Sequence, residues 1–157
     1  MENMKYAGFW WRFLAYLIDA IVLWVVNLIV ISPLIGLFGL SAASSMSADM
    51  TQSEAIGMAG AFFGAAMVTN LALIVIAWLY FAIMESSKFQ GTLGKMAIGI
   101  IVTDLEGNRI SFARATGRYF GKILSSMILL IGYIMAGFTE KKQALHDMLA
   151  STLVWKK

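Results

Sequence analysis

The chain has 157 residues, of which 60% are hydrophobic and only 13% charged, and its formal net charge is +3. Soluble domains carry about 25% charged residues, so this composition excludes a soluble globular domain and indicates a membrane protein. Cysteine is absent and His146 is the single histidine, which excludes disulfides, thiolate sites and a histidine-rich metal site. We therefore expect no cofactor and no metal.

The first long apolar run, from Phe13 to Ile31, is interrupted only by Asp19 and Asn27. As a helix it would extend about 28 Å, close to the bilayer core of about 30 Å. We expect a transmembrane span over about residues 9–39, with a kink or end at Ser32-Pro33. A cleavable signal peptide is the alternative, but its apolar core is normally only about 7–15 residues long.

A second apolar run, over about residues 58–84, contains no charged side chain and predicts a second span. Trp10 and Trp11 precede the first run, and Trp78 and Tyr80 lie near the end of the second. Both aromatic clusters suit one interfacial belt. The two predicted helices would therefore run antiparallel.

Lysine and arginine are absent from residues 40–57 but frequent in residues 85–122 and near both ends of the chain. An excess of these residues marks the cytoplasmic side of a membrane. We expect a multi-pass protein of the inner cell membrane, with a cytoplasmic N-terminus and the loop at 40–57 outside.

A third apolar segment, residues 123–138, would give only about 24 Å of helix against a bilayer core of about 30 Å. A full span would also place the lysines of the tail outside. We expect a re-entrant helical hairpin over about residues 119–138, which returns the tail to the cytoplasm. A third span is the alternative, because a bilayer can thin locally.

A small cytoplasmic β-element is predicted by a strand-like run at residues 97–103, a turn at 104–108 and a return strand at 109–111. Residues 151–155 could add a strand, but only on the same side of the membrane. The expected fold is thus an α-helical membrane protein with two transmembrane helices, a re-entrant hairpin and a small β-element, in a single domain over residues 1–157.

Arg114, Arg118 and Lys122 recur every four positions, which places them on one helical face. A basic helix lying on the inner leaflet gains about 1 kcal/mol per charge from anionic lipid. We expect the bilayer, including this lipid, as a partner, although simple snorkelling anchors explain the same pattern. Basic residues placed this way fit membrane topology better than nucleic-acid binding.

Gly60 and Gly64 give a small-residue face on the second predicted helix. Such a face permits close helix approach, either to the first helix or to another copy of the chain. Because two spans alone offer little interior, we expect a homo-oligomer.

An enzyme is not expected, because His146-Asp147 lacks a nucleophile motif and adjacent helical residues point about 100° apart.

Asp19 is the first candidate for function, because an unpaired carboxylate inside a membrane helix costs a few kcal/mol or more. Arg12 precedes it by seven residues, about 10.5 Å along the helix axis, and tends to snorkel away from it. Both residues therefore need partners elsewhere. The basic candidates for Asp19 are Lys95, Arg114, Arg118 and Lys122, and the acidic candidates for Arg12 are Glu85 and Asp147.

Asn70 and Asn27 would lie deeper in the membrane than Asp19, counted from the inner aromatic belt. A carboxylate followed by amides at increasing depth could relay a cation or a proton. The alternative is that these side chains join helices, at about 0.6–2 kcal/mol each.

Three segments in order resemble the motifs of the RDD family of prokaryotic membrane proteins. They are residues 6–19 (YAGFWWRFLAYLID), 90–95 (QGTLGK) and 143–152 (QALHDMLAST). The family is named for one arginine and two aspartates, which correspond here to Arg12, Asp19 and Asp147.

The resemblance implies a transport-related role and makes Asp147 the preferred partner of Arg12, and Lys95 that of Asp19. We expect a protein that handles a cation or proton at Asp19. The rival hypothesis is a non-transporting scaffold or assembly partner in which the arginine and the aspartates lock the fold.

Overall fold

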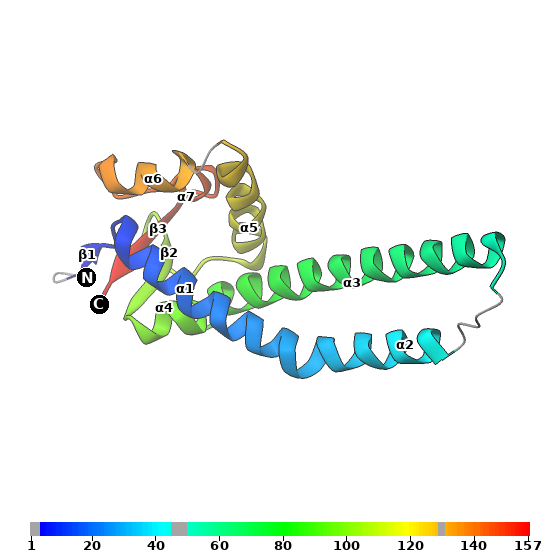
Figure 1. The fold of residues 1–157 in the computed structure, drawn as a ribbon. Coiled ribbons are helices and arrows are strands. Elements are labelled where there is room, and N and C mark those ends of the chain that lie inside the picture. The colour runs from blue at the N-terminus through cyan, green and yellow to red at the C-terminus, as the bar shows by residue number, and fades with distance from the viewer. Residues whose placement is uncertain (1–3, 45–49, 129–130) are drawn as a thin grey trace. The chain divides into compact units, whose positions relative to one another are not determined.

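A computed structural model describes residues 4–44, 50–128 and 131–157 (Figure 1). The chain forms two compact units. We call Met1–Ile21 with Ala77–Lys157 the core unit, and Val22–Ile76 the hairpin unit.

Among the described residues, two helical segments are long and apolar enough to cross a membrane. The first is α1 (Phe9–Val26), which continues through a π-helical turn η1 (Asn27–Ile31) into α2 (Ser32–Ser44), and the second is α3 (Gln52–Ser86). They confirm the two predicted transmembrane helices. The widened turn η1 ends two residues before Pro33, which cannot donate a helical hydrogen bond.

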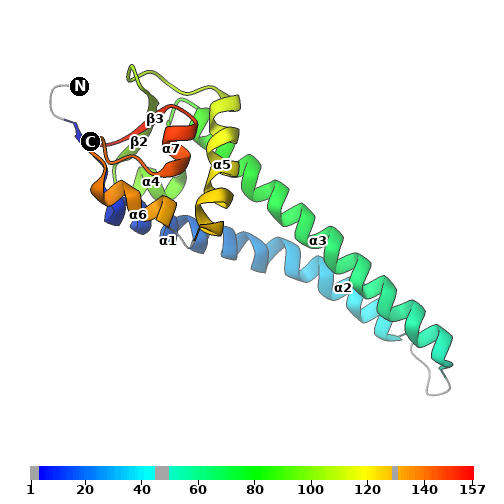
Figure 2. The same ribbon diagram turned by 90° about the horizontal axis from the view of Figure 1, so that it is seen from above.

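In the hairpin unit, residues 22–44 and 52–76 run antiparallel (Figure 2). Their large apolar side chains are mostly exposed, among them Phe63, Val68 and Leu71. Exposed apolar side chains over such a length fit a helix pair whose solvent is the lipid bilayer.

The core unit contains a three-stranded sheet of β1 (Lys5–Tyr6), β2 (Ile100–Asp104) and β3 (Thr152–Lys156). The strand order is β1-β3-β2 and both pairs are antiparallel, with Lys5 opposite Lys156 and Val102 opposite Val154. The sheet therefore joins the beginning, the middle and the end of the chain. The predicted strands near 97–103 and 151–155 are confirmed.

The predicted return strand at 109–111 is wrong, because both edges of β2 are already occupied. β3 pairs with one edge, and on the other the amide of Val102 donates to the carbonyl of Gln90 at 2.7 Å. After the turn at 104–108, Ile110 instead enters the hydrophobic core, and Ser111 caps the next helix.

The described part of the core unit contains four further helices: α4 (Leu93–Ala97), α5 (Phe112–Met127), α6 (Ile131–Phe138) and α7 (Leu145–Leu149). Glycines allow close packing between them. A Cβ on Gly121 would lie 3.0 Å from the Cβ of His146 in α7, and one on Gly132 would lie 2.7 Å from Ser125 Oγ. From the sheet, Ile100, Val102 and Val154 form a hydrophobic core with Ala15 of α1, Ala82 of α3 and Ala115 of α5.

Helices α5 and α6 meet at an angle of 103°. This bent pair occupies the segment predicted as a hairpin, and its geometry fits either a broken span or a re-entrant segment.

Candidate functional site

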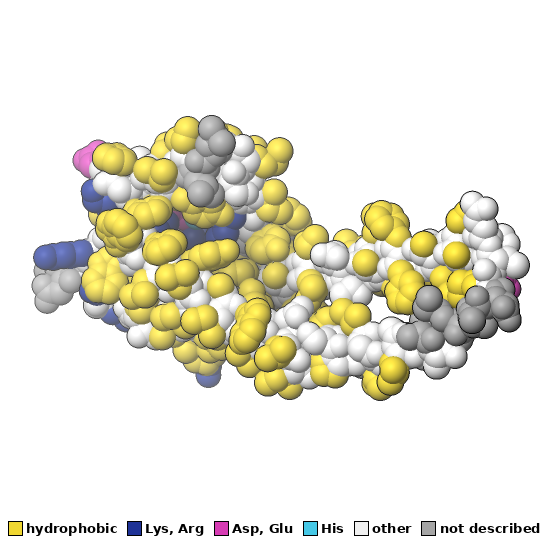
Figure 3. All heavy atoms as spheres, in the orientation of Figure 1, with side chains coloured by type: hydrophobic (Ala, Val, Ile, Leu, Met, Phe, Trp, Pro, Cys, Tyr) yellow, Lys and Arg dark blue, Asp and Glu magenta, His cyan; other side chains and the backbone are white. Residues whose placement is uncertain are grey.

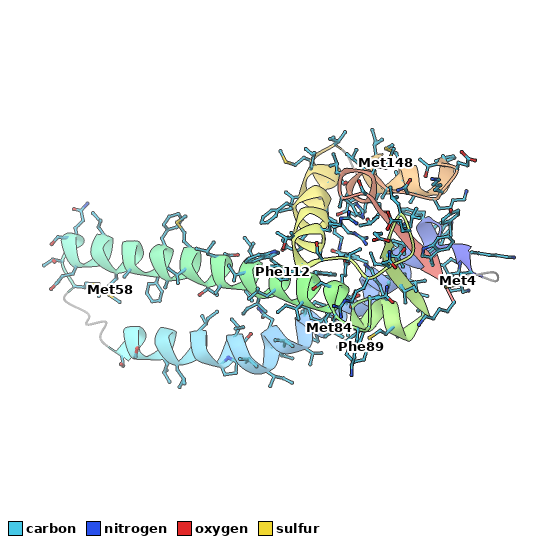
Figure 4. All side chains as sticks on the ribbon, turned by 180° about the vertical axis from the view of Figure 1, so that it is seen from behind. Met4, Met58, Met84, Phe89, Phe112 and Met148 are labelled. Carbon is cyan, nitrogen blue, oxygen red and sulfur yellow. The ribbon has the colours of Figure 1, made fainter. Side chains whose placement is uncertain are left out.

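Charged side chains from five helices gather inside the core unit. Figure 4 shows nitrogen and oxygen atoms in the space bounded by α5, α7 and the sheet. We call this group the charged cluster; its members are Arg12, Glu85, Lys95, Arg118, Lys122 and Asp147.

Arg12 joins the start of α1 to the C-terminal part of the chain. Its Nη1 forms an ion pair with Asp147 Oδ2, while Nε donates to the carbonyl of Ala7 at 2.9 Å and Nη2 to that of Lys142 at 2.6 Å. The structure therefore contains the predicted Arg12–Asp147 pair.

Asp147 is completely buried, and its Oδ2 also accepts from the backbone amide of Ala144 at 3.0 Å. Burial disfavours the ionised carboxylate, but the positive charges of Arg12 and Arg118 outweigh it and hold the pKa of Asp147 well below its usual range. Asp147 is therefore an anion that two guanidinium groups share.

Arg118 lies between the two carboxylates of the charged cluster and is only 1% exposed. Its Nη2 lies 2.8 Å from Asp147 Oδ1 and its Nε lies 3.6 Å from Glu85 Oε2. The prediction that Arg114, Arg118 and Lys122 face the inner leaflet is thus wrong for Arg118 and Lys122. The face turns inward because the buried carboxylates require counter-charges, and only Arg114 stays half exposed, 3.6 Å from Asp104.

Glu85, at the end of α3, binds Lys95. Lys95 Nζ lies 2.5 Å from Glu85 Oε1, and Lys122 Nζ lies 3.4 Å from the same oxygen. The predicted Lys95–Asp19 pair is therefore wrong, because the Lys95 side chain extends from α4 towards α3. Burial lowers the pKa of Lys95 to about 7, although the negative charge of Glu85 opposes this shift.

Asp19 accepts hydrogen bonds from three neutral donors. They are the Tyr80 hydroxyl at 2.8 Å, the Thr92 hydroxyl at 2.5 Å and the Gly94 amide at 2.8 Å. The carboxylate is 1% exposed, and among the described residues no cation lies within ion-pair distance of it. Asp19 thus ties α1 to the end of α3 and to the first turn of α4.

Gly94 makes this arrangement possible. A Cβ at position 94 would lie 2.2 Å from the Ala15 carbonyl oxygen and 2.9 Å from the Asp19 carboxyl carbon. Thr92 is the N-cap of α4 and accepts from the Lys95 amide while its hydroxyl donates to Asp19. The sequence motifs at 6–19 and 90–95 therefore meet in direct contact.

Asn27 and Asn70 belong to the hairpin unit, and each bonds within its own helical segment. Asn70 Nδ2 donates to the Ala66 carbonyl at 2.8 Å, and Asn27 Oδ1 accepts from the Ser32 hydroxyl at 3.4 Å. Each side-chain amide therefore has a hydrogen-bond partner within its own helical segment. Their alignment with Asp19 into a relay stays a prediction.

His146 is buried, with Nδ1 3.4 Å from Ser125 Oγ and Nε2 3.5 Å from Asp147 Oδ1. Burial lowers the pKa of His146 to about 3, against the attraction of Asp147, so the ring is neutral at pH 7. The Ser125 hydroxyl donates to the Gly121 carbonyl at 2.8 Å. Within the described ranges, no group of three His, Asp or Glu side chains could hold a metal ion.

Glu85 was expected only as a possible partner of Arg12, whereas it pairs with Lys95, Arg118 and Lys122. Three further residues of the site, Tyr80, Thr92 and Gly94, were not predicted. Glu85 carries the same signal as Asp19, since it is an acidic residue that directly follows a charge-free apolar run. Tyr80, Thr92 and Gly94 act through a hydroxyl or a backbone amide, so a search for opposite charges does not find them.

Two proteins of Bacillus subtilis (strain 168) are similar to this chain over most of its length. The protein named "Uncharacterized protein YxaI" is 42% identical over 152 residues, which cover 96% of this chain and 97% of that protein. The "Uncharacterized membrane protein YteJ" is 35% identical over 155 residues, which cover 95% of this chain and 80% of that protein. No solved structure matches. The profile of the RDD family matches residues 6–151 and includes Arg12, Asp19 and Asp147, so the chain is a membrane protein of the RDD family.

Proposed function

We propose that this chain is a non-catalytic membrane scaffold or assembly partner in which Arg12, Asp19 and Asp147 lock the fold. The observation that carries this proposal is the set of neutral donors around Asp19. An ionised carboxylate has about four lone-pair positions, and Tyr80, Thr92 and Gly94 occupy three of them. A carboxylate bound in this way is suited to holding helices together.

The lock connects all three family motifs. Asp19 holds the loop and first turn around residues 90–95 against α1, and Arg12 holds α7 through Asp147. Removing one partner of a buried ion pair typically costs about 3–5 kcal/mol. A structural role therefore accounts for each residue of the arginine–aspartate set.

Asp19→Asn in proteoliposomes tests the proposal. The amide NH2 of asparagine would face donors that now bind a carboxylate, so we expect a lower melting temperature. We also expect no specific proton or cation flux from either protein. Wild-type flux that disappears in a variant with an unchanged melting temperature would refute the lock. Glu106→Gln, at an exposed position in the turn after β2, is the matched control for loss of one carboxylate.

Proton handling is a second candidate, and the Glu85–Lys95 pair favours it. The two side chains lie 2.5 Å apart in the core unit, and burial lowers the pKa of Lys95 to about 7. A group that titrates near neutral pH can take up and release protons under physiological conditions. Wild-type proton flux that Lys95→Met abolishes, without a loss of folded protein, would favour this candidate over the scaffold.

We also propose that the N-terminus is cytoplasmic and that α5 and α6 re-enter the membrane without crossing it. Strands β1, β2 and β3 belong to one sheet, and a bilayer cannot separate strands that share backbone hydrogen bonds. The segments before α1, after α3 and after α6 therefore lie on one side. The excess of lysine and arginine on this side indicates that it faces the cytoplasm. The protein would then lie in the inner cell membrane.

Single cysteines at Ser53 and Lys157 test this topology in intact cells, because the natural chain has none. An impermeant thiol reagent should label position 53 and leave position 157 unlabelled. Labelling of position 157 would show a third crossing.

Self-association through α3 is part of the proposed scaffold role. A Cβ on Gly57, Gly60 or Gly64 would meet no atom of the described residues within 4 Å, so this small-residue face is open to another helix. A cysteine at Gly60 should form a disulfide-linked dimer in membranes, whereas one at Phe62, about 200° away around the same helix, should do so less.

A further inference from the structure

The charged cluster carries more positive than negative charge. Four cationic side chains surround the two carboxylates of Glu85 and Asp147, which leaves an excess of two positive charges. Asp19 does not offset this excess through an ion pair, because its described partners are neutral. Excess charge inside a protein is costly unless a counter-charge accompanies it.

Deprotonation of Lys95 can relieve one of these charges, since burial lowers the pKa of Lys95 to about 7. Arg118 cannot relieve the other, because a guanidinium keeps its proton in proteins. The remaining charge therefore calls for an anion beyond the side chains of the cluster.

Arg118 also has hydrogen-bond donors to spare. Its Nε and Nη1 atoms are buried and find no hydrogen-bond partner among the described residues. The distance of 3.6 Å from Nε to Glu85 Oε2 is too long for a hydrogen bond. A buried guanidinium with two unused donors is suited to an acceptor with several oxygens.

Lys122 provides a second cation on the accessible side of Arg118. The two residues are one helical turn apart on α5, and the Lys122 side chain is 20% exposed, against 1% for Arg118. Its Nζ lies 4.3 Å from the centre of the Phe81 ring. Figure 3 shows Lys and Arg side chains at the bottom of a hollow between α6 and α1, bordered by hydrophobic side chains.

We propose that Arg118 and Lys122 bind a phosphate group, either that of an anionic phospholipid or free phosphate. The unpartnered N–H groups of Arg118 can donate charge-assisted hydrogen bonds to phosphate oxygens, and Lys122 adds a point charge. This ligand goes beyond the scaffold role and differs from an inner-leaflet surface contact, because Arg118 is inside the core unit.

Binding can be measured as an increase in melting temperature of the full chain in a nonionic detergent. One arm compares added phosphatidylglycerol with phosphatidylcholine, and the other compares inorganic phosphate with chloride at equal ionic strength. Stabilisation by phosphatidylglycerol alone identifies a lipid headgroup, and stabilisation by inorganic phosphate identifies the free ion as sufficient. Neither stabilising over its control would overturn the proposal.

Three variants connect binding to the site. Arg118→Lys keeps the charge beside Asp147 but loses the Nε and Nη1 donors, and Lys122→Gln removes the outer cation. We expect each to weaken apparent affinity about tenfold. Lys141→Gln, at an exposed position after α6, is the matched control and should bind like the wild type. Equal affinity of Lys122→Gln and Lys141→Gln would overturn the proposal even if Arg118→Lys fails to fold.

Discussion

Arg118 Nη2 lies 2.8 Å from Asp147 Oδ1, with both side chains almost completely excluded from solvent. The same carboxylate also pairs with Arg12, so α1, α5 and α7 meet at one anion. A buried ion pair adds little net stability compared with apolar side chains of the same volume, but loss of one partner is severe. The consequence is that Asp147 tolerates replacement poorly.

We expect Asp147→Asn to lower the free energy of unfolding by about 3–5 kcal/mol, because it leaves Arg12 and Arg118 buried without their counter-charge. Chemical unfolding in detergent, followed by tryptophan fluorescence, measures the change. Asp104→Asn is a comparison at an ion pair near the surface, where Arg114 is half exposed. A loss for Asp147→Asn no larger than for Asp104→Asn would contradict the structural lock.

A second prediction concerns the contact of α4 with α1. Gly94→Ala should lower the free energy of unfolding by about 1–3 kcal/mol, the typical cost of overpacking a close contact. The new Cβ would lie 2.2 Å from the backbone carbonyl oxygen of Ala15, an atom that cannot move independently of α1.

Gly117→Ala is the matched control in α5, because a Cβ there meets nothing within 4 Å among the described residues. A glycine in a helix interior is less stable than alanine by about 0.5–1 kcal/mol, so this variant should be neutral or stabilised. Equal melting temperatures for Gly94→Ala and Gly117→Ala would show that α4 does not pack against α1 as described.

The pH dependence of stability should reveal His146. Burial lowers its folded pKa to about 3, while the unfolded chain takes up the proton near the ordinary histidine pKa of 6.5. The unfolded state therefore binds more protons between these values, and stability falls as the pH decreases from about 6.5 towards 3.

His146→Gln removes this contribution, so its melting temperature should change less than that of the wild type between pH 6.5 and 4.5. The lowered pKa of Asp147 acts in the same direction but only below the ordinary aspartate value of 3.8, outside this window. Parallel pH profiles for the two proteins would contradict a buried neutral His146.

The apolar runs were sufficient to predict α1 and α3, because span length follows from bilayer thickness. The period of Arg114, Arg118 and Lys122 correctly placed them on one face of α5. It could not say whether that face meets lipid or the protein interior, since the answer depends on Glu85 and Asp147, which come from α3 and α7.

The contacts of Asp19 show a second limit. Charge need suggested a cationic partner, but hydroxyl groups and a backbone amide satisfy the carboxylate instead. Which amide is available depends on the close approach of α4 at Gly94, a long-range packing feature. The short strand β1 was likewise not predicted, because only its pairing with β3 makes Lys5–Tyr6 a strand.

Lys95 gives a prediction of the same sign as that of His146, in a higher pH range. Burial lowers its folded pKa to about 7 from the ordinary lysine pKa of 10.5, so between these values the unfolded chain holds a proton that the folded protein has released. Stability should therefore increase as the pH rises from about 7 to 10.5.

Lys95→Met cannot show this increase. The melting temperature of the wild type should therefore rise relative to that of the variant at higher pH. Lys88→Met, at an exposed position just after α3, controls for loss of a lysine charge. A wild-type profile parallel to that of Lys95→Met would mean that Lys95 keeps its proton beside Glu85 throughout this range, and the pair could then not exchange protons near neutral pH.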